Sequence, residues 1–237
     1  MRVADFIVDW FHQNGVDTIF TVSGGGSIVL CDAMLSNTKI KYVCCHHEQA
    51  VAFAAEGYAR AKKTFGVGIV TTGPGGTNCI TGVSSAWIDS IPVIFISGQV
   101  FASQTIQKTG TRQIGVQEIN IIDLVQKNTK WSTMMVNAED VKKTLEKAHF
   151  IATSGRPGPV WIDIPADIQG VTVNPDELKS YIHNHNYTGI LDNVDKVKLV
   201  VEKLLKSKRP IIHIGQGVRI SKSIKLLKQY IEKHKIP

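Results

Sequence analysis

Short apolar runs rich in β-branched residues alternate with helix-like segments along residues 1–170. The clearest run, Val-Ile-Phe-Ile at residues 93–96, is apolar at every position. Such a run is typical of a strand in a parallel sheet that helices cover on both faces. We therefore expect an α/β fold with a doubly wound, mainly parallel six-stranded sheet and helices on both of its faces.

The expected elements follow one another in a regular β-α order. The strands are expected at residues 18–22, 41–45, 67–72, 92–97, 130–136 and 159–164, and the helices at 3–13, 27–35, 47–62, 79–90, 119–125 and 138–154. Parallel sheets bind ligands beyond the carboxyl ends of their strands. The loops of interest are therefore residues 23–26, 45–48, 73–78 and 98–117.

The pattern breaks after residue 170. Residues 171–191 carry Pro, Asn, His and Gly without periodicity, which favours a linker. A second β-α pattern then predicts a helix at 194–205, a strand at 210–214 and a helix at 221–233. Two helices and one strand cannot bury a core alone. We expect one complete domain at 1–170, a linker at 171–191 and the start of a truncated second α/β domain at 192–237.

The net charge of +7 belongs to the last part of the chain. Residues 1–170 hold 14 basic and 14 acidic residues, whereas residues 171–237 hold 13 and 6. These lysines follow helix-like stretches without interleaved stacking aromatics, so we expect solvated helix faces and no nucleic-acid partner. Apolar stretches far shorter than ~20 residues predict no membrane partner. Four cysteines without C-x-x-C spacing favour reduced thiols in the cytoplasm.

Glu48 begins a helix directly after a strand. The simpler interpretation is a solvated carboxylate that the helix dipole favours. The apolar residues around it favour a second interpretation, because burial disfavours the charged form and a buried carboxyl group could hold or pass a proton. His46 and His47 lack the spacing of metal ligands, so structural roles are expected for them.

Three glycine turns could each approach a ligand or serve only as tight turns. Residues 73–78 read Gly-Pro-Gly-Gly-Thr-Asn and open a helix, whose N-terminus attracts anions, but they match neither standard phosphate-binding motif. Residues 23–27 share this ambiguity. Gly-Gln-Gly at residues 215–217 is a partial dinucleotide fingerprint, and a nucleotide-binding Rossmann protein is the hypothesis that rests on it alone.

A set of short motifs runs in order through the whole first domain. They are Gly24-Gly25, His47-Glu48-Gln49, Ala55-Glu56-Gly57-Tyr58-Ala59-Arg60, Thr72-Gly73-Pro74-Gly75 with Thr77-Asn78, Asp89-Ser90-Ile91-Pro92, Gly98-Gln99-Val100, Gln117-Glu118, residues 152–160 and Asp163-Ile164-Pro165. With them, residues 1–170 resemble the pyrimidine-binding domain of thiamine-diphosphate enzymes, specifically the acetolactate synthase-like group. Residues 192–237 resemble the opening of that family's central domain.

The resemblance implies an enzyme, a lyase or transferase that decarboxylates or ligates 2-oxo acids with thiamine diphosphate. It implies a catalytic role for Glu48, which would hydrogen-bond N1′ of the aminopyrimidine and favour the tautomer that takes the C2 proton. Gly25, Pro74 and Asn78 match positions that face the cofactor, and Gln117 matches a catalytic glutamine directed at substrate and C2. The implied substrates are a 2-oxo acid such as pyruvate and a second carbonyl acceptor.

The resemblance also implies that this chain carries half of a site. In the family, a third domain with a Gly-Asp-Gly…Asn motif holds the diphosphate and Mg²⁺, and the site forms between subunits. No Gly-Asp-Gly occurs in this chain. We therefore expect no metal ligands here, Mg²⁺ bound outside this chain, FAD as a further candidate cofactor, a homodimer or higher oligomer, and no turnover by this chain alone.

Four residues depart from the family pattern. Val22-Ser23 replace Tyr-Pro before the paired glycines, Phe101 replaces a Pro, and Val116 replaces a Phe before Gln117. These positions lie near the substrate in the family, so a related decarboxylase or carboligase fits as well as an acetolactate synthase. The alternative from a different class is a non-catalytic or regulatory pyrimidine-domain partner of a related enzyme.

Overall fold

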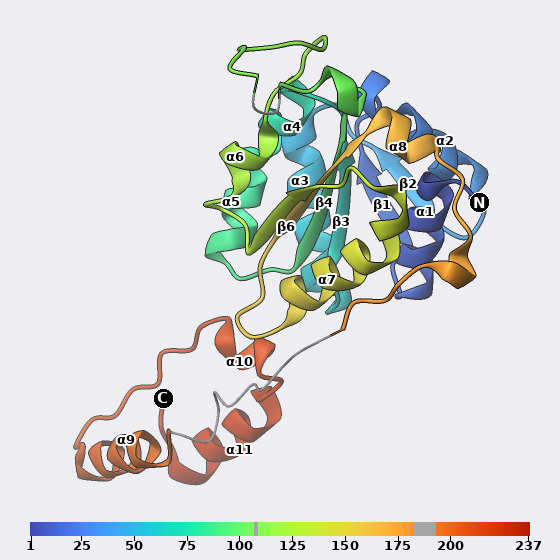
Figure 1. Cartoon of the computed structure of the whole chain (residues 1–237). Coiled ribbons are helices and arrows are strands. Elements are labelled where there is room, and N and C mark those ends of the chain that lie inside the picture. The colour runs from blue at the N-terminus through green and yellow to red at the C-terminus, as the bar shows by residue number, and fades with distance from the viewer. Residues whose placement is uncertain (107–108, 183–192) are drawn as a thin grey trace. The chain divides into compact units, whose positions relative to one another are not determined.

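The computed structural model describes residues 1–106, 109–182 and 193–237, and forms two compact units, Met1–Tyr181 and Ile182–Pro237 (Figure 1). Residues 171–181 of the expected linker belong to the first unit. Val173 and Leu178 are buried there, and the backbone N–H of Val3 donates to the carbonyl of Val171 at 2.9 Å. Residues 183–191 of that expected linker lie outside the described residues.

The first unit contains a six-stranded sheet in which every neighbouring pair of strands is parallel. The strand order is β2-β1-β3-β4-β6-β5. The strands are β1 (Thr18–Thr21), β2 (Lys41–Cys44), β3 (Gly66–Val70), β4 (Val93–Gln99), β5 (Trp131–Met134) and β6 (Val160–Pro165). The predicted fold class is confirmed.

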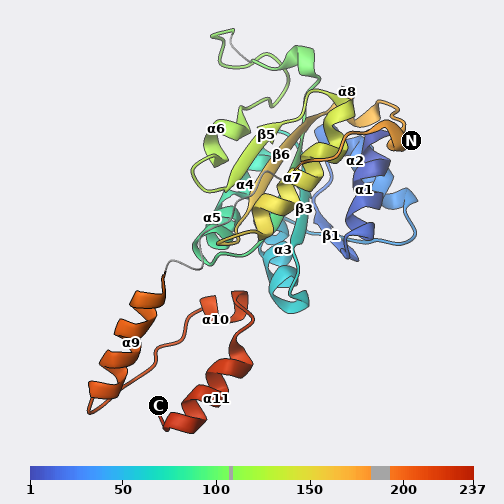
Figure 2. The same ribbon diagram turned by 60° about the horizontal axis from the view of Figure 1, so that its bottom comes forward.

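Helices cover both faces of this sheet (Figures 1 and 2). One face packs against α1 (Val3–Gln13), α2 (Ile28–Ser36), α7 (Val141–Thr153) and α8 (Ala166–Gly170). The other packs against α3 (Glu48–Lys62), α4 (Pro74–Asn78), α5 (Ile80–Ile88) and α6 (Ile121–Val125). Single-turn helices lie at η1 (Gly25–Ser27), η2 (Ala102–Gln104), η3 (Ala138–Asp140) and η4 (Pro175–Glu177).

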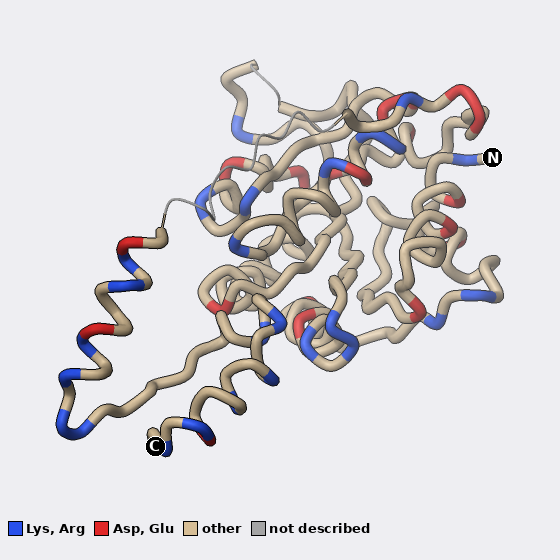
Figure 3. The backbone as a smooth tube through the Cα atoms, turned by 90° about the horizontal axis from the view of Figure 1, so that it is seen from below, with Lys and Arg blue, Asp and Glu red and all other residues tan. Residues whose placement is uncertain are grey.

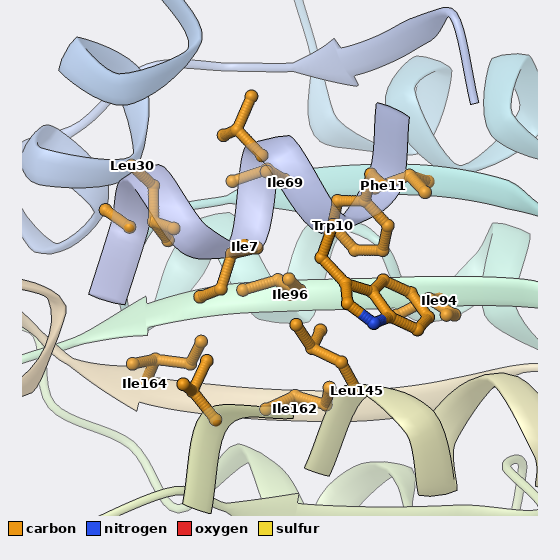
Figure 4. Packing of buried hydrophobic residues seen from close by; sticks show 14 of the residues in the cluster. Ile7, Trp10, Phe11, Leu30, Ile69, Ile94, Ile96, Leu145, Ile162 and Ile164 are labelled. Atoms are coloured by element: carbon orange, nitrogen blue, oxygen red, sulfur yellow. The ribbon is translucent and has the colours of Figure 1, made fainter. Parts of the chain in front are cut away.

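Strand β4 shows why the apolar run forms the centre of the sheet, since all seven of its residues are buried. Ile94 and Ile96 pack on the α1 side, where Figure 4 shows them among Ile7, Trp10 and Leu145. Val93 and Phe95 pack on the other side, against α3 and α5. Because successive side chains of a strand point to opposite faces, a strand covered on both faces is apolar throughout. Burying each such side chain contributes ~1.5–3 kcal/mol.

The glycine-rich segment after β3 is partly helical. Residues 73–78 were predicted to form a loop, but residues 74–78 form α4. Pro74 is the first residue of this helix, a position where proline's fixed φ and missing N–H cost nothing. Gly73 precedes it with φ +59°, a conformation that favours glycine. The prediction of a loop was wrong for residues 74–78, because the low helix propensity of glycine did not prevent a helical turn there.

The strand order creates a switch point between β1 and β3. From β1 the chain moves outward to β2 on one side, and from β3 it moves outward to β4 on the other. The loops beyond the carboxyl ends of β1 and β3 therefore diverge, and such a crevice is where doubly wound sheets bind ligands. Two of the glycine turns, at residues 23–27 and 73–78, begin at this point.

The second unit contains the helices α9 (Val194–Lys206), α10 (Gly217–Ile220) and α11 (Ile224–His234), and no strand among its described residues. The strand predicted at 210–214 does not form. Only a single backbone hydrogen bond joins this segment to the chain end, from Ile212 N–H to the Pro237 carbonyl at 3.1 Å. A strand needs a ladder of such bonds with a neighbour. The charged residues follow α9 and α11, as the sequence predicted (Figure 3).

Candidate cofactor-binding site

Two turns meet at the switch point, one after β1 and one after β3. The backbone N–H of Gly26 donates to Thr71 Oγ1 at 3.1 Å and so joins them. A Cβ atom at Gly24 would lie 2.5 Å from Thr71 Cβ, so only glycine fits at that position. At Gly25, in contrast, a Cβ atom would meet nothing within 4 Å. The turn is therefore fixed by Thr71 and leaves open space beside Gly25.

Glu48 lies at the same edge of the sheet, because α3 begins directly after β2. Its residue is only 9% exposed, which contradicts the interpretation as a solvated carboxylate. Asn78 Nδ2, at the end of α4, donates to Glu48 Oε2 at 2.9 Å. Among the described residues, no group donates a hydrogen bond to the other oxygen, Oε1. A Cβ atom at Gly75 would lie 3.6 Å from Oε1, so the absence of a side chain there leaves room before this oxygen.

The Cys79 thiol donates a hydrogen bond to the backbone carbonyl of Glu48, with Sγ 3.2 Å from the oxygen. Burial raises the pKa of the Cys79 thiol well above its usual range, and the negative charge of Glu48 raises it further. The thiol therefore remains protonated and donates this hydrogen bond. Neutral Cys79 and Asn78 together hold the first turn of α3 against the start of α5.

The histidines beside Glu48 differ in role. His47 Nδ1 accepts a hydrogen bond from the backbone N–H of Gln49 at 3.1 Å and so caps α3. The structural role predicted for His47 is confirmed, while His46 is exposed. Within residues 1–106, 109–182 and 193–237, His, Cys, Asp and Glu side chains form no group of three or more that could hold a metal ion.

Gln117 approaches the site from the loop between β4 and α6. Its backbone adopts the left-handed region, with φ +60°. Its carbonyl oxygen packs directly against Gly73, where a Cβ atom would clash with it. Gln117 therefore packs against the residue that directly precedes Pro74, where α4 begins.

The structure thus brings the predicted site residues to one edge of the sheet, some in direct contact and some linked through a neighbouring residue. Glu48 and Asn78 are joined by a hydrogen bond, and Gly25 belongs to the turn that binds Thr71. Gln117 packs against Gly73, the residue before Pro74. The sequence reasoning did not single out Thr71 or Cys79 as contacts. No local signal marks them, because each acts on a segment at least 31 positions away in the chain.

The partial fingerprint at residues 215–217 lacks its structural context. No strand precedes it among the described residues, and the helix that follows, α10, has four residues. A dinucleotide site needs a strand, a glycine turn and a helix in that order. The structure therefore does not support the nucleotide-binding hypothesis.

A doubly wound sheet with glycine turns at its switch point and a buried carboxylate at the same edge is typical of an α/β cofactor-binding domain. Residues 1–139 match the family model described as thiamine pyrophosphate enzyme, N-terminal TPP binding domain. The chain belongs to this family. Thiamine pyrophosphate is the same compound as thiamine diphosphate.

Relatives align with nearly the whole chain. It is 34% identical over 237 residues to acetolactate synthase isozyme 2 large subunit of Escherichia coli, covering 100% of this chain and 41% of the relative. It is 36% identical over 242 residues to acetolactate synthase 2, chloroplastic, of Nicotiana tabacum, covering 99% and 34%. With the Arabidopsis thaliana acetolactate synthase, identity is 34% over 223 residues, covering 90% and 31%. The chain therefore spans about a third to two fifths of these relatives.

Proposed function

We propose that this chain is the N-terminal part of a thiamine-diphosphate-dependent 2-oxo acid decarboxylase or carboligase of the acetolactate synthase type. It binds the aminopyrimidine half of the cofactor and activates it through Glu48. The observation that carries this proposal is the buried Glu48 carboxylate, held by Asn78 on one oxygen and open on the other. Similarity to acetolactate synthases at 34–36% identity supports it.

The residues present fit the aminopyrimidine. The Glu48 side chain is largely buried, and its Oε1 is free to accept a hydrogen bond from a protonated pyrimidine nitrogen. When bound, thiamine diphosphate supplies a nucleophilic C2 carbon that adds to the carbonyl of a 2-oxo acid. Before this addition, Glu48 Oε1 would hold the proton at N1′, and Asn78 on Oε2 would fix the direction of the carboxylate.

The remaining site residues bind and orient. Gly25 presents backbone without a side chain, so a flat ring can approach it closely. Pro74 stands exposed at the first position of α4 and supplies an apolar contact. Gln117 supplies an uncharged amide that can donate a hydrogen bond to the carboxylate or carbonyl of the 2-oxo acid.

The site is completed by segments outside this chain. The relatives are more than twice as long, which supports a diphosphate and Mg²⁺ site, and FAD where it is used, in those further segments. Exposed Tyr42, Val43 and Phe53 lie on β2 and α3, the elements that flank Glu48, and offer an apolar surface to a second subunit. We therefore propose a homodimer or higher oligomer, pyruvate or a similar 2-oxo acid as substrate, a second carbonyl acceptor, and no turnover by this chain alone.

The cytoplasm remains the proposed compartment. All four cysteines, which lie in the described part of the chain, are free thiols, as a reducing compartment favours. The Nicotiana and Arabidopsis relatives are named chloroplastic. Within the described residues, none of the helices has both the length and the apolar character needed to cross a membrane.

A test begins with the DNA beyond codon 237 and in neighbouring genes. A segment with Gly-Asp-Gly…Asn there supports the catalytic proposal and, joined with this chain, gives what we call the completed enzyme. The completed enzyme is predicted to decarboxylate pyruvate or a related 2-oxo acid in the presence of thiamine diphosphate and Mg²⁺. Absence of such a segment would favour the alternative, a non-catalytic or regulatory partner of a related enzyme.

A further inference from the structure

Glu118, the residue after Gln117, binds the loop that precedes it. It is 7% exposed, and its two oxygens accept hydrogen bonds from three backbone N–H groups. Oε1 accepts from Ile106, and Oε2 accepts from Ile114 at 3.0 Å and from Gly115 at 3.4 Å. The Gly115 N–H is shared with the Gln104 carbonyl, at 2.9 Å. A buried carboxylate with several backbone donors is a strong local anchor, because bonds to a charged acceptor exceed neutral ones in strength.

Ile119, the residue after Glu118, is held by the sheet. Gln99 Nε2, at the end of β4, donates to the Ile119 carbonyl at 3.1 Å and to Asp163 Oδ2 at 2.9 Å. Asp163 Oδ1 accepts from Ser97 Oγ at 2.5 Å, and Ser97 Oγ accepts from Trp161 Nε1 at 2.8 Å. A chain of buried polar groups therefore runs from the centre of the sheet to residue 119.

Gln117 lies between these anchors in a conformation that it would not hold alone. A non-glycine residue in the left-handed region costs about 1–3 kcal/mol and persists only where its surroundings enforce it. At φ +60° the Gln117 carbonyl packs against Gly73, at the entrance of the cofactor site. The two anchors and Gly73 together supply that enforcement.

We propose that Glu118 is a positioning residue for Gln117: its carboxylate gathers the loop amides of Ile106, Ile114 and Gly115 and thereby fixes Gln117 beside the cofactor site. The Gln99–Asp163 pair is the second anchor, on the sheet side. Glu118 does not touch the reacting atoms. The catalytic part of this inference rests on the proposed function, whereas the anchoring itself is a property of this chain alone.

The anchoring is tested by hydrogen–deuterium exchange on the 237-residue chain with Glu118→Gln. An amide side chain keeps the size of glutamate but loses the charge and one acceptor oxygen. The amides of Ile106 and Ile114 are predicted to exchange at least tenfold faster, while the amides of β3 and β4 keep their protection. The Gly115 amide should change less, because it also donates to the Gln104 carbonyl. Glu139→Gln, at an exposed position, is the matched control and should change none of these rates. Unchanged protection in the Glu118 variant would overturn the proposal.

The positioning role is tested in the completed enzyme. Glu118→Gln is predicted to lower kcat/KM for the 2-oxo acid by tenfold to a hundredfold, since small misplacements of an orienting group have effects of this size. The Kd for thiamine diphosphate should stay unchanged, because Glu48 and Asn78 are untouched. Glu118→Asp keeps the charge on a side chain one methylene shorter, so it should show smaller changes in both amide exchange and kcat/KM. This variant replaces Glu118→Gln in the test if the Gln variant does not fold.

The outcomes separate the two proposals. Loss of loop protection with unchanged kcat/KM would refute the positioning role and leave the proposed function standing. An inactive completed enzyme with wild-type Glu118 would refute the proposed function, while the exchange result would still decide whether Glu118 anchors the loop.

Discussion

Asp163 places a carboxyl group in the middle of the sheet. Ionisation of this group is predicted to make the stability of the protein depend on pH. The residue is 2% exposed, and burial raises the pKa of its carboxyl group from 3.8 to about 7. Hydrogen bonds from Ser97 and Gln99 oppose this shift, and the negative charge of Glu118 adds to it.

The direction of the effect follows from proton binding. The unfolded chain releases the Asp163 proton near pH 3.8, whereas the folded chain keeps it until about pH 7. Between these values the folded state binds more protons, so raising the pH lowers the free energy of unfolding. At about 1.36 kcal/mol per pKa unit, the whole window corresponds to about 4 kcal/mol, of which about 3 kcal/mol falls between pH 5 and pH 8.

The matched perturbation is Asp163→Asn. Asparagine has the same shape as a protonated aspartic acid, can donate to Ser97 Oγ and can accept from Gln99, but does not ionise. Urea unfolding of both proteins at pH 5 and pH 8 measures the difference. From pH 5 to pH 8, the free energy of unfolding of the wild type should fall by about 3 kcal/mol relative to that of the variant.

Comparison with the variant also removes other titrations from the result. Burial lowers the pKa of His149, which acts in the opposite direction, but His149 is present in both proteins. A difference between wild type and Asp163→Asn that stays constant from pH 5 to pH 8 would refute the reasoning.

Two further predictions concern packing and the site. Gly82→Ala places a Cβ atom against Ala52, where α5 crosses α3, and should lower stability by about 1–3 kcal/mol in thermal unfolding; its control Gly57→Ala meets nothing within 4 Å and should raise stability by about 0.5–1 kcal/mol. If both alanines lowered the Tm equally, the close approach of the helices would be wrong. Asn78→Ala should reduce turnover of the completed enzyme about tenfold, because Glu48 loses its hydrogen-bond partner; unchanged turnover would contradict this role of Asn78.

The centre of the sheet could be predicted from sequence because β3, β4 and β6 are buried on both faces. Residues 93–96 are apolar throughout for that reason, and every residue of β4 is buried. The segment at 210–214 carries a similar signal without becoming a strand, since strand formation depends on a neighbour that local sequence does not specify. Asp163 interrupts the otherwise apolar run of β6, and this was the visible sign of the polar network in the sheet.

The site could be predicted only in part. The position of Glu48 at a strand end marked it as a candidate, but its pairing with Asn78 depends on the packing of α3 against α4, which the sequence pattern does not contain. Thr71 carries no local signal at all. Its hydroxyl matters because the turn after β1 folds onto it, 45 positions away in the chain. Glu118 appeared in the sequence only as part of a motif. Its hydrogen bonds to the preceding loop could not be predicted, because they depend on how that loop folds back onto the carboxylate.

The most direct test of Glu48 as the group that activates thiamine diphosphate is exchange of the cofactor's C2 proton for deuterium, followed by NMR after acid quench. In the completed enzyme, Glu48→Gln is predicted to slow this exchange at least about a hundredfold, in the range typical of a lost general acid–base group. Glu139→Gln, exposed and remote in sequence, should exchange at the wild-type rate. Equal exchange rates in wild type and Glu48→Gln would contradict the role proposed for the buried carboxylate.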